Sequence, residues 1–364
     1  MGRQELPLFL YIIMNRQFLV YGLSLAFFVA CESKPKIHPD AVKPVLSTEP
    51  VNYDTDDPAI WINLKDPSSS LIIGTDKNED GGLFVFDLNG KIIADKTVAG
   101  LKRPNNVDLL QGVVLGNDTL DIAVTGERLT HNMRVFSLPD MKPIDNGGIP
   151  MYVGEQGLEE RDLMGVALYH RKSDGKVFAI MGRKTGPSEG YLWQYELTAN
   201  ADGIVNARVV RKFGKFSGVK EIEAIAVDAE LGFIYYSDEN IGVRKYYADP
   251  EKGNEELALF GQRDFTDDHE GISIYKTGDS TGFIIVSDQQ ANAFNIYRRE
   301  GDNGNPHVHT LLKKVYLSTM ESDGSEVTNV ALGNAYPRGI FVAMSDDKTF
   351  QYYRVEDILG DLLD

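Results

Sequence analysis

One pattern of short apolar strands occurs six times along this chain. Each copy contains a strand that ends on an aromatic residue, and successive end residues are 50, 59, 51, 51 and 56 residues apart. The six end residues are Phe86, Phe136, Tyr195, Tyr246, Tyr297 and Tyr353. Stretches rich in Val, Ile, Phe and Tyr that are bounded by Gly, Asp or Asn are typical of β-strands. The repeat therefore constrains the fold more than any single motif does.

In each copy two further strands precede the aromatic one. In the last copy we expect the first of these strands at residues 327–333. In the first copy we also expect a fourth strand at residues 91–98, because Asn89-Gly90 is a strong hairpin signal. Six units of four antiparallel strands predict an all-β fold. The fold that matches is a six-bladed β-propeller with four-stranded blades around a central channel.

The last copy lacks a fourth strand of its own, because residues 355–363 have the pattern of a short amphipathic helix. We expect residues 41–52 to supply that strand, so that an N-terminal strand closes the last blade and completes the ring. Two stacked β-sandwich domains are the alternative architecture. Such domains would not require a sixfold period.

The N-terminal region has the pattern of an export signal. Residues 18–30 form an apolar run of 13 residues after Arg16, whereas a membrane-spanning helix needs about 20. The single cysteine, Cys31, directly follows the small residue Ala30. This junction resembles the lipobox of bacterial lipoproteins, although Phe28 stands where Leu is usual. A buried structural thiol is the alternative interpretation of the cysteine.

Three segments follow from this interpretation. We expect residues 1–30 to be a lipoprotein signal peptide and Cys31 to carry the lipid. Residues 31–50 are rich in Pro, Lys and Ser and are expected to be a tether, and residues 51–364 are expected to form the propeller domain. The protein would then be an exported lipoprotein of the cell envelope, held in the outer membrane on the periplasmic or cell-surface side.

The formal charge of −17 limits the partners that the chain can bind. Proteins bind nucleic acids through many Lys and Arg contacts to phosphates, so this balance argues against a nucleic-acid partner. We expect an acidic, monomeric domain.

The channel end of each blade carries polar residues at equivalent positions, and these positions converge on the axis of a propeller. The ends of the second strands carry cations in the first three copies and carboxylates in the last three: Lys77, Arg128 and Lys184, then Glu239, Asp288 and Asp346. Just before the inner strands lie further acids and amides: Asp56, Asp57, Asn105, Asn106, Glu223, Asp268, Glu270, Asp323 and Glu326. One half of the ring suits phosphate oxygens and the other suits a hard cation.

Clustered carboxylates raise one another's pKa unless a cation neutralises them. Calcium fits this set, because it takes about six to eight oxygen ligands from Asp, Glu, Asn and backbone carbonyls. Zinc is not supported, since the six histidines show no zinc-ligand spacing. The usual phosphatase nucleophile motifs are also missing. We therefore expect bound metal ions to activate a water molecule.

Several sequence blocks together resemble the alkaline β-propeller phytases, calcium-dependent secreted bacterial enzymes. The blocks are residues 56–61 (DDPAIW), 105–108 (NNVD), 194–197 (QYEL), 268–271 (DHEG) and 336–339 (YPRG). The resemblance extends from about residue 53 to residue 358. It implies hydrolysis of phytate, inositol hexakisphosphate, as a calcium complex that occupies two adjacent phosphate subsites.

The resemblance also implies roles for single residues. Lys77 and Arg128 would bind the phosphate that is cleaved, and Lys184 would bind its neighbour. The calcium-binding and catalytic acids would be Asp57, Glu223, Glu239, Asp268 and Glu270, with Asp323 and Asp346 in further calcium loops. Met164 stands where well-known members have a tyrosine that donates to phosphate, which a thioether cannot do. We expect Arg103 or Arg338 to supply the missing donor.

The expected reaction is attack of a calcium-activated water on phosphorus. In it, Lys77 and Arg128 stabilise the developing charge and Glu223 orients or deprotonates the water. Two other functions remain open: a calcium-dependent propeller lactonase or esterase, and a non-catalytic binding propeller at the cell surface.

Overall fold

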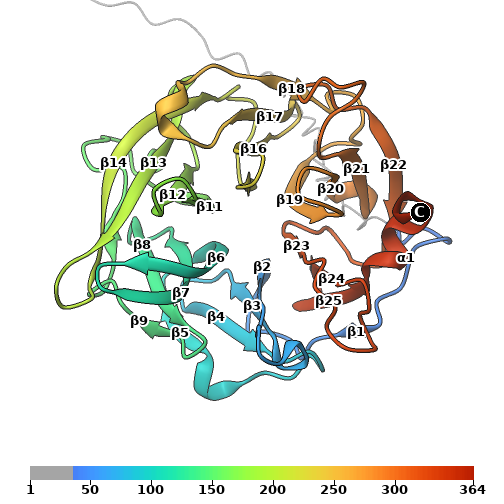
Figure 1. Cartoon of the computed structure of the whole chain (residues 1–364), viewed down its shortest axis with the longest axis horizontal. Helices are drawn as coiled ribbons and strands as arrows, with labels where there is room; N and C mark the ends of the chain where they lie inside the picture. Colours follow the sequence, from blue (N-terminus) through green and yellow to red (C-terminus); the bar gives the residue numbers. More distant parts are fainter. Residues whose placement is uncertain (1–35) are drawn as a thin grey trace, which may run out of the picture. The chain divides into compact units, whose positions relative to one another are not determined.

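Six β-sheets stand around a common axis, each with its first strand toward the centre (Figure 1). The structure is a computed structural model, and it describes residues 36–364. The expected signal peptide, residues 1–30, and the expected lipidation site, Cys31, lie outside this range. Among the described residues, no helix has the length and apolarity needed to cross a membrane.

The first three blades follow one another in chain order, from the inner strand outward. Blade 1 contains β2 (Thr55–Trp61), β3 (Leu71–Asp76), β4 (Gly81–Phe86) and β5 (Val98–Leu101). Blade 2 contains β6 (Pro104–Leu115), β7 (Asp118–Glu127) and β8 (Asn132–Leu138), with β9 (Lys142–Pro143) and β10 (Ile149–Pro150) both pairing with β8. Blade 3 contains β11 (Leu163–Arg171), β12 (Lys176–Arg183), β13 (Glu189–Ala199) and β14 (Val205–Lys215).

The second half of the ring repeats this order. Blade 4 contains β15 (Ile225–Asp228), β16 (Phe233–Asp238), β17 (Gly242–Tyr247) and β18 (Ala258–Phe260). Blade 5 contains β19 (His269–Lys276), β20 (Gly282–Asp288), β21 (Ala293–Arg298) and β22 (Leu311–Tyr316). Blade 6 contains β23 (Ser325–Val327), β24 (Ile340–Ser345), β25 (Thr349–Arg354) and β1 (Leu46–Ser47). The helices are short: α1 (Val355–Leu359) and the 3₁₀ turns Pro67–Ser69, Ala94–Lys96, Pro250–Lys252, Gln289–Ala291 and Gly360–Leu363.

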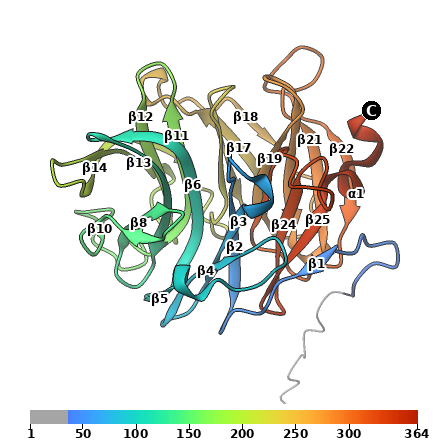
Figure 2. The same cartoon turned by 60° about the horizontal axis from the view of Figure 1, so that its bottom comes forward.

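Strand β1 closes the ring as predicted. It lies antiparallel to β25, with Leu46 opposite Tyr352 (Figure 2). The backbone N–H of Val51 also donates to the Lys348 carbonyl at 3.0 Å. The later part of the expected tether, residues 31–50, therefore belongs to the propeller.

Two strand predictions were wrong. Residues 91–98 do not form the fourth strand of blade 1, because Glu49 accepts hydrogen bonds from Lys91 and from the backbone of Ile92, and the chain leaves the sheet after a single bridge at Ile92. The outer strand is β5, which starts at Val98. In blade 6 the inner strand stops at Val327 and does not continue to residue 333.

Apolar side chains fill the space between neighbouring blades. The six aromatic end residues that define the repeat are all buried. Tyr195, for example, packs with residues of blades 2 and 3, and Tyr297 packs with residues of blades 4 and 5. A Cβ atom at Gly74 would lie 2.1 Å from the ring of Phe350 in blade 6, so only glycine fits there. Packing between blades explains the period of the sequence.

Candidate active site

One position in each blade, directly after the second strand, faces the axial cleft. The backbone N–H of this residue donates to a carbonyl in the segment that enters the inner strand of the same blade. The six residues are Lys77, Arg128, Lys184, Glu239, Gln289 and Asp346. Identical backbone contacts thus place three cations, an amide and two carboxylates around one opening.

The last residue of the second strand, directly before the cleft position, binds the segment that enters the inner strand in blades 1 and 5. The Asp76 carboxylate accepts from the backbone of Asp54 at 2.7 Å, and Asp288 accepts from that of Thr266 at 3.0 Å. Asp288 is fully buried and forms an ion pair with Lys314 at 2.6 Å. The prediction that Asp288 is a metal ligand was therefore wrong by one position, since successive strand residues point to opposite faces. Its cleft-facing neighbour is Gln289.

Lys77 lies between two carboxylates that come from different blades. Its ammonium group forms ion pairs with Asp56 and, at 3.1 Å, with Asp323. Burial pushes the pKa of Lys77 down, but Asp56, Asp323 and Glu223 outweigh that effect, and its pKa lies well above the usual value. Lys77 is thus a permanent cation at the cleft.

Arg128 is buried and reaches across the cleft. Its Nη2 atom donates to Asn105 at 2.7 Å, to the sulfur of Met164 at 2.6 Å and to Glu223 at 3.5 Å. The Met164 sulfur accepts from the guanidinium where a tyrosine would offer a hydroxyl. These contacts fix the direction of the guanidinium.

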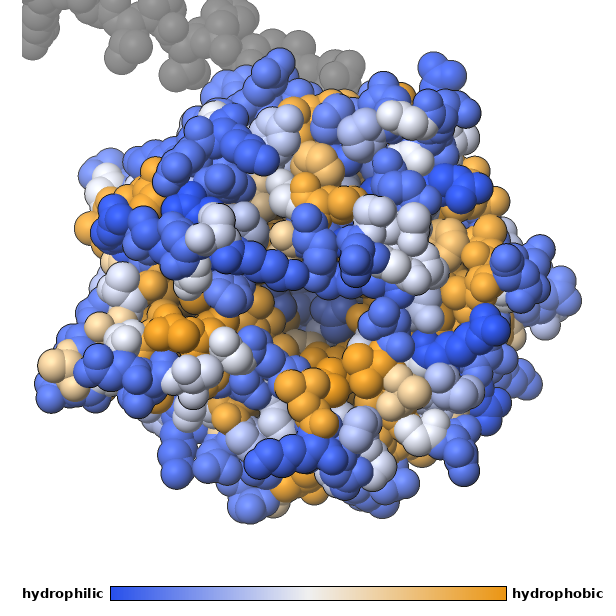
Figure 3. Space-filling model, in the orientation of Figure 1, coloured by the Kyte–Doolittle hydropathy of each residue, from blue (hydrophilic) through white to orange (hydrophobic). Residues whose placement is uncertain are grey.

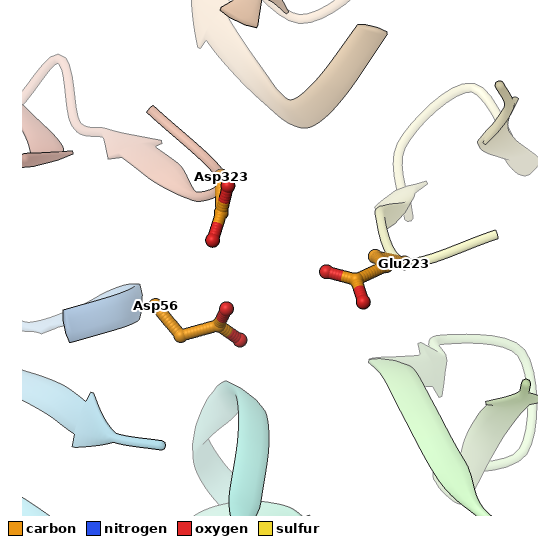
Figure 4. Close-up of side chains that lie close together, drawn as sticks. All are labelled: Asp56, Glu223 and Asp323. Carbon is orange, nitrogen blue, oxygen red and sulfur yellow. The ribbon is translucent and has the colours of Figure 1, made fainter. Parts of the chain in front are cut away.

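Three carboxylates meet beside these cations. Asp56, Glu223 and Asp323 each offer an oxygen atom, and the three atoms lie within 4.8 Å of one another (Figure 4). Burial raises the pKa of Glu223 to about 8 and that of Asp323 to about 7, although Lys77 lowers both. A bound cation would relieve this cost of ionisation.

Asp56 was expected at the axis of the ring, but the metal-ligand role was assigned to its neighbour Asp57. The Asp57 carboxylate lies in the channel below the cleft, where it accepts from the backbone of Val107 at 3.1 Å. Burial, and then the charge of Asp56, raise its pKa well above the usual value. Asn106 lines the same channel. Both residues lie below the cleft carboxylates.

A second group of acids continues the ring. Burial and then Glu223 raise the pKa of Glu239 to about 9, and burial and then Glu239 raise that of Glu270 well above normal. Among the described residues, no donor contacts the buried Oε2 atom of Glu270. Asp268 accepts from Lys220, from Asn240 at 2.8 Å and from Gln290 at 2.8 Å. Lys220 and Gln290 were not predicted from the sequence.

The chemistry of this donor set fits a hard divalent cation. The clustered side chains offer only oxygen atoms, they carry excess negative charge, and one of them has an unpaired buried oxygen. The space-filling view shows a hollow at the centre of the ring (Figure 3). Two half-buried acids, Asp108 and Glu326, also line the channel.

The remaining predicted substrate contacts divide into two groups. Lys184 lies at the cleft, forms an ion pair with Glu221 at 3.5 Å and has a side chain that is 36% exposed. Arg103 lies on the same face, because its carbonyl accepts from the Arg128 backbone at 3.0 Å. Arg338 does not lie on this face. Arg338 precedes β24, whereas the cleft residue Asp346 follows β24. About 17–20 Å of strand separates them, so the prediction for Arg338 was wrong.

The fold and the cleft define a class: a six-bladed β-propeller that combines buried cations with a carboxylate cluster able to hold a metal ion. The phytase family model matches residues 19–356. A 3-phytase of Bacillus subtilis (strain 168) is 30% identical over 302 residues, which cover 80% of this chain and 74% of the relative. The chain therefore belongs to the phytase family. It is a phosphoric monoester hydrolase, and the family is a metal-dependent group.

Solved structures with a similar fold include two distant proteins. One is the Kuenenia stuttgartiensis hydrazine synthase, with 12% identity and a TM-score of 0.47; the match covers 82% of this chain and 83% of that one. The other is the WD40 β-propeller domain of Doa1, with 10% identity and a TM-score of 0.48; the match covers 86% of this chain and 96% of that one. At this level of similarity they add nothing to the function.

Proposed function

We propose that the cleft removes phosphate from phytate, inositol hexakisphosphate, with calcium as the resident metal. The observation that carries the proposal is the contact of Lys77 with Asp56 and Asp323, beside the contact of Arg128 with Glu223. Cations that bind phosphate thus lie directly against carboxylates that can bind metal. The name of the Bacillus subtilis relative, a 3-phytase, supports the choice of substrate.

Asp56, Glu223 and Asp323 would hold calcium, with Glu239, Asp268 and Glu270 as further ligands. When bound, calcium would neutralise these carboxylates and activate a water molecule for attack on phosphorus. Lys77 and Arg128 would hold the phosphate oxygens and stabilise the charge that develops on them. Glu223, which contacts Arg128 at 3.5 Å, would orient or deprotonate the water. Lys184, which is more exposed, would bind a neighbouring phosphate.

A time course of phosphate release from phytate, with added calcium and with chelator, tests this proposal. We expect release that depends on calcium and stops when chelator is added. A lactonase or esterase would instead hydrolyse lactones or carboxylic esters in a parallel assay. A binding propeller would release nothing and would retain phytate. Either outcome would contradict the proposal.

We further propose that the protein is an exported monomer attached to the cell envelope through a lipid on Cys31. The support is the apolar run at residues 18–30 and the position of the single cysteine. Labelling of cells with a fatty-acid probe should mark the wild-type protein and leave Cys31→Ala unmarked. Equal labelling of both would contradict the anchor.

A further inference from the structure

Four cations at the cleft, Lys77, Arg128, Lys184 and Lys220, each form an ion pair with a nearby acid. Lys184 pairs with Glu221, and Lys220 pairs with Asp268, in the same way as Lys77 pairs with Asp56. Lys220 differs from Lys77 in its surroundings: its side chain is 42% exposed, whereas that of Lys77 is 13% exposed. A long exposed lysine can leave its partner at little cost.

Asp268 is the cleft acid that Lys220 contacts most closely. The ammonium group donates to both carboxylate oxygens, and the amides of Asn240 and Gln290 each donate to one of them at 2.8 Å. Both oxygens are thus occupied. A metal ion that used Asp268 would have to replace the only positive charge among these three donors.

The released ammonium would stand in the part of the ring that has no cation at its equivalent positions. Blades 4 to 6 place Glu239, Gln289 and Asp346 there, opposite the cations of blades 1 to 3. Lys220 lies in the loop between β14 and β15, directly before Glu221 and Glu223. It can therefore reach an anion that Lys77, Arg128 and Lys184 do not bind.

We infer that Lys220 is a displaceable counter-ion of Asp268 and, once metal replaces it, a fourth anion-binding group of the cleft beside Lys77, Arg128 and Lys184. This inference rests on the proposed function. It assigns the site to substrates with several phosphates on one ring, because a simple monoester has no group for Lys220 to bind. It also makes metal binding and binding of the polyanion mutually favourable, since the coupling between two ligands is reciprocal.

Calorimetric titrations of the wild type and of Lys220→Met test the inference with calcium alone. We expect Lys220→Met to bind calcium about 10-fold more tightly, because the competing ammonium is gone. In saturating calcium we expect the same variant to bind inositol hexakissulfate, a non-hydrolysable polyanion, about 10-fold more weakly. Lys220→Arg, which keeps the charge, should stay close to the wild type in both titrations.

The matched control is Lys172→Met, which removes an exposed lysine from the β11–β12 loop at the other end of blade 3. It should leave both titrations unchanged. If Lys220→Met binds calcium and the polyanion as the wild type does, while the wild type still releases phosphate from phytate with calcium, the inference is overturned and the proposed function stands. If the wild type binds no calcium, both are overturned.

Discussion

Glu326 offers a test of the electrostatics of the channel that is separate from catalysis. Burial raises its pKa from 4.5 to about 8; Asp108 adds to this, whereas the backbone N–H of Val327, which donates at 2.6 Å, opposes it. The folded protein therefore holds a proton that the unfolded chain has already lost. Stability from this group is complete below pH 4.5 and is lost as the pH rises through 8.

The size of the pKa shift of Glu326 sets the size of the expected loss of stability. A pKa that moves from 4.5 to about 8 corresponds to at most about 5 kcal/mol of unfolding free energy. The side chain of Glu326 is only half-buried, so water in the channel screens part of it. We expect the metal-free protein to lose about 2 kcal/mol through Glu326 between about pH 5 and pH 9. Glu326→Gln, which cannot ionise, should not suffer this loss.

Urea unfolding in chelator, at both ends of this pH range, measures the difference. At the acidic end Glu326→Gln and the wild type should have similar unfolding free energies. At the alkaline end the variant should be more stable by about 2 kcal/mol. The control is Glu189→Gln, an exposed residue at the start of β13, which should follow the wild type. Equal pH dependence of Glu326→Gln and the wild type would refute the reasoning.

Three further predictions concern the cleft and the packing between blades. Lys77→Met should lower turnover on phytate by about 10²–10³, since it removes one preorganised donor, and unchanged phosphate release relative to Lys172→Met would exclude that role. Gln289→Glu should bind calcium several-fold more tightly in calorimetry, because it adds a carboxylate beside Asp323; weaker binding would place Gln289 outside the metal site. Gly74→Val should lower the unfolding free energy by about 1–3 kcal/mol in urea titrations, because its side chain would overlap Phe350, and a neutral effect would show that the blades can separate freely.

The architecture could be predicted from the sequence because its main determinant is periodic. An aromatic residue, such as Phe86 or Tyr297, stands at the same point of every repeat and fills the space between blades. Strand ends were less predictable. Glu49, which is far from Lys91 in the sequence, interrupts the expected fourth strand of blade 1, and no local pattern reports such a contact.

At two positions the residue at the cleft is the chain neighbour of the residue that was predicted as a metal ligand. Asp56 and Asp57 are adjacent acids, and only the local bulge in β2 decides which of them reaches the cleft. Asp288 was predicted as the acid at the end of the second strand, whereas the cleft position is the next residue, Gln289. An alignment of the repeats on the buried residue that ends the second strand, such as Asp76, would have identified Gln289. Lys220 could not be predicted, because it lies in a loop outside the repeat.

The central claim is that cations and carboxylates of the cleft form one calcium-dependent phosphatase site. Phosphate release from phytate by chelator-treated protein, measured as calcium is added back, tests it most directly when Asp56→Asn and Glu223→Gln are assayed beside the wild type. The account predicts that release by the wild type rises with calcium and that both variants stay near background at the same calcium concentration. Full release in chelator, or release by both variants equal to that of the wild type, would contradict it.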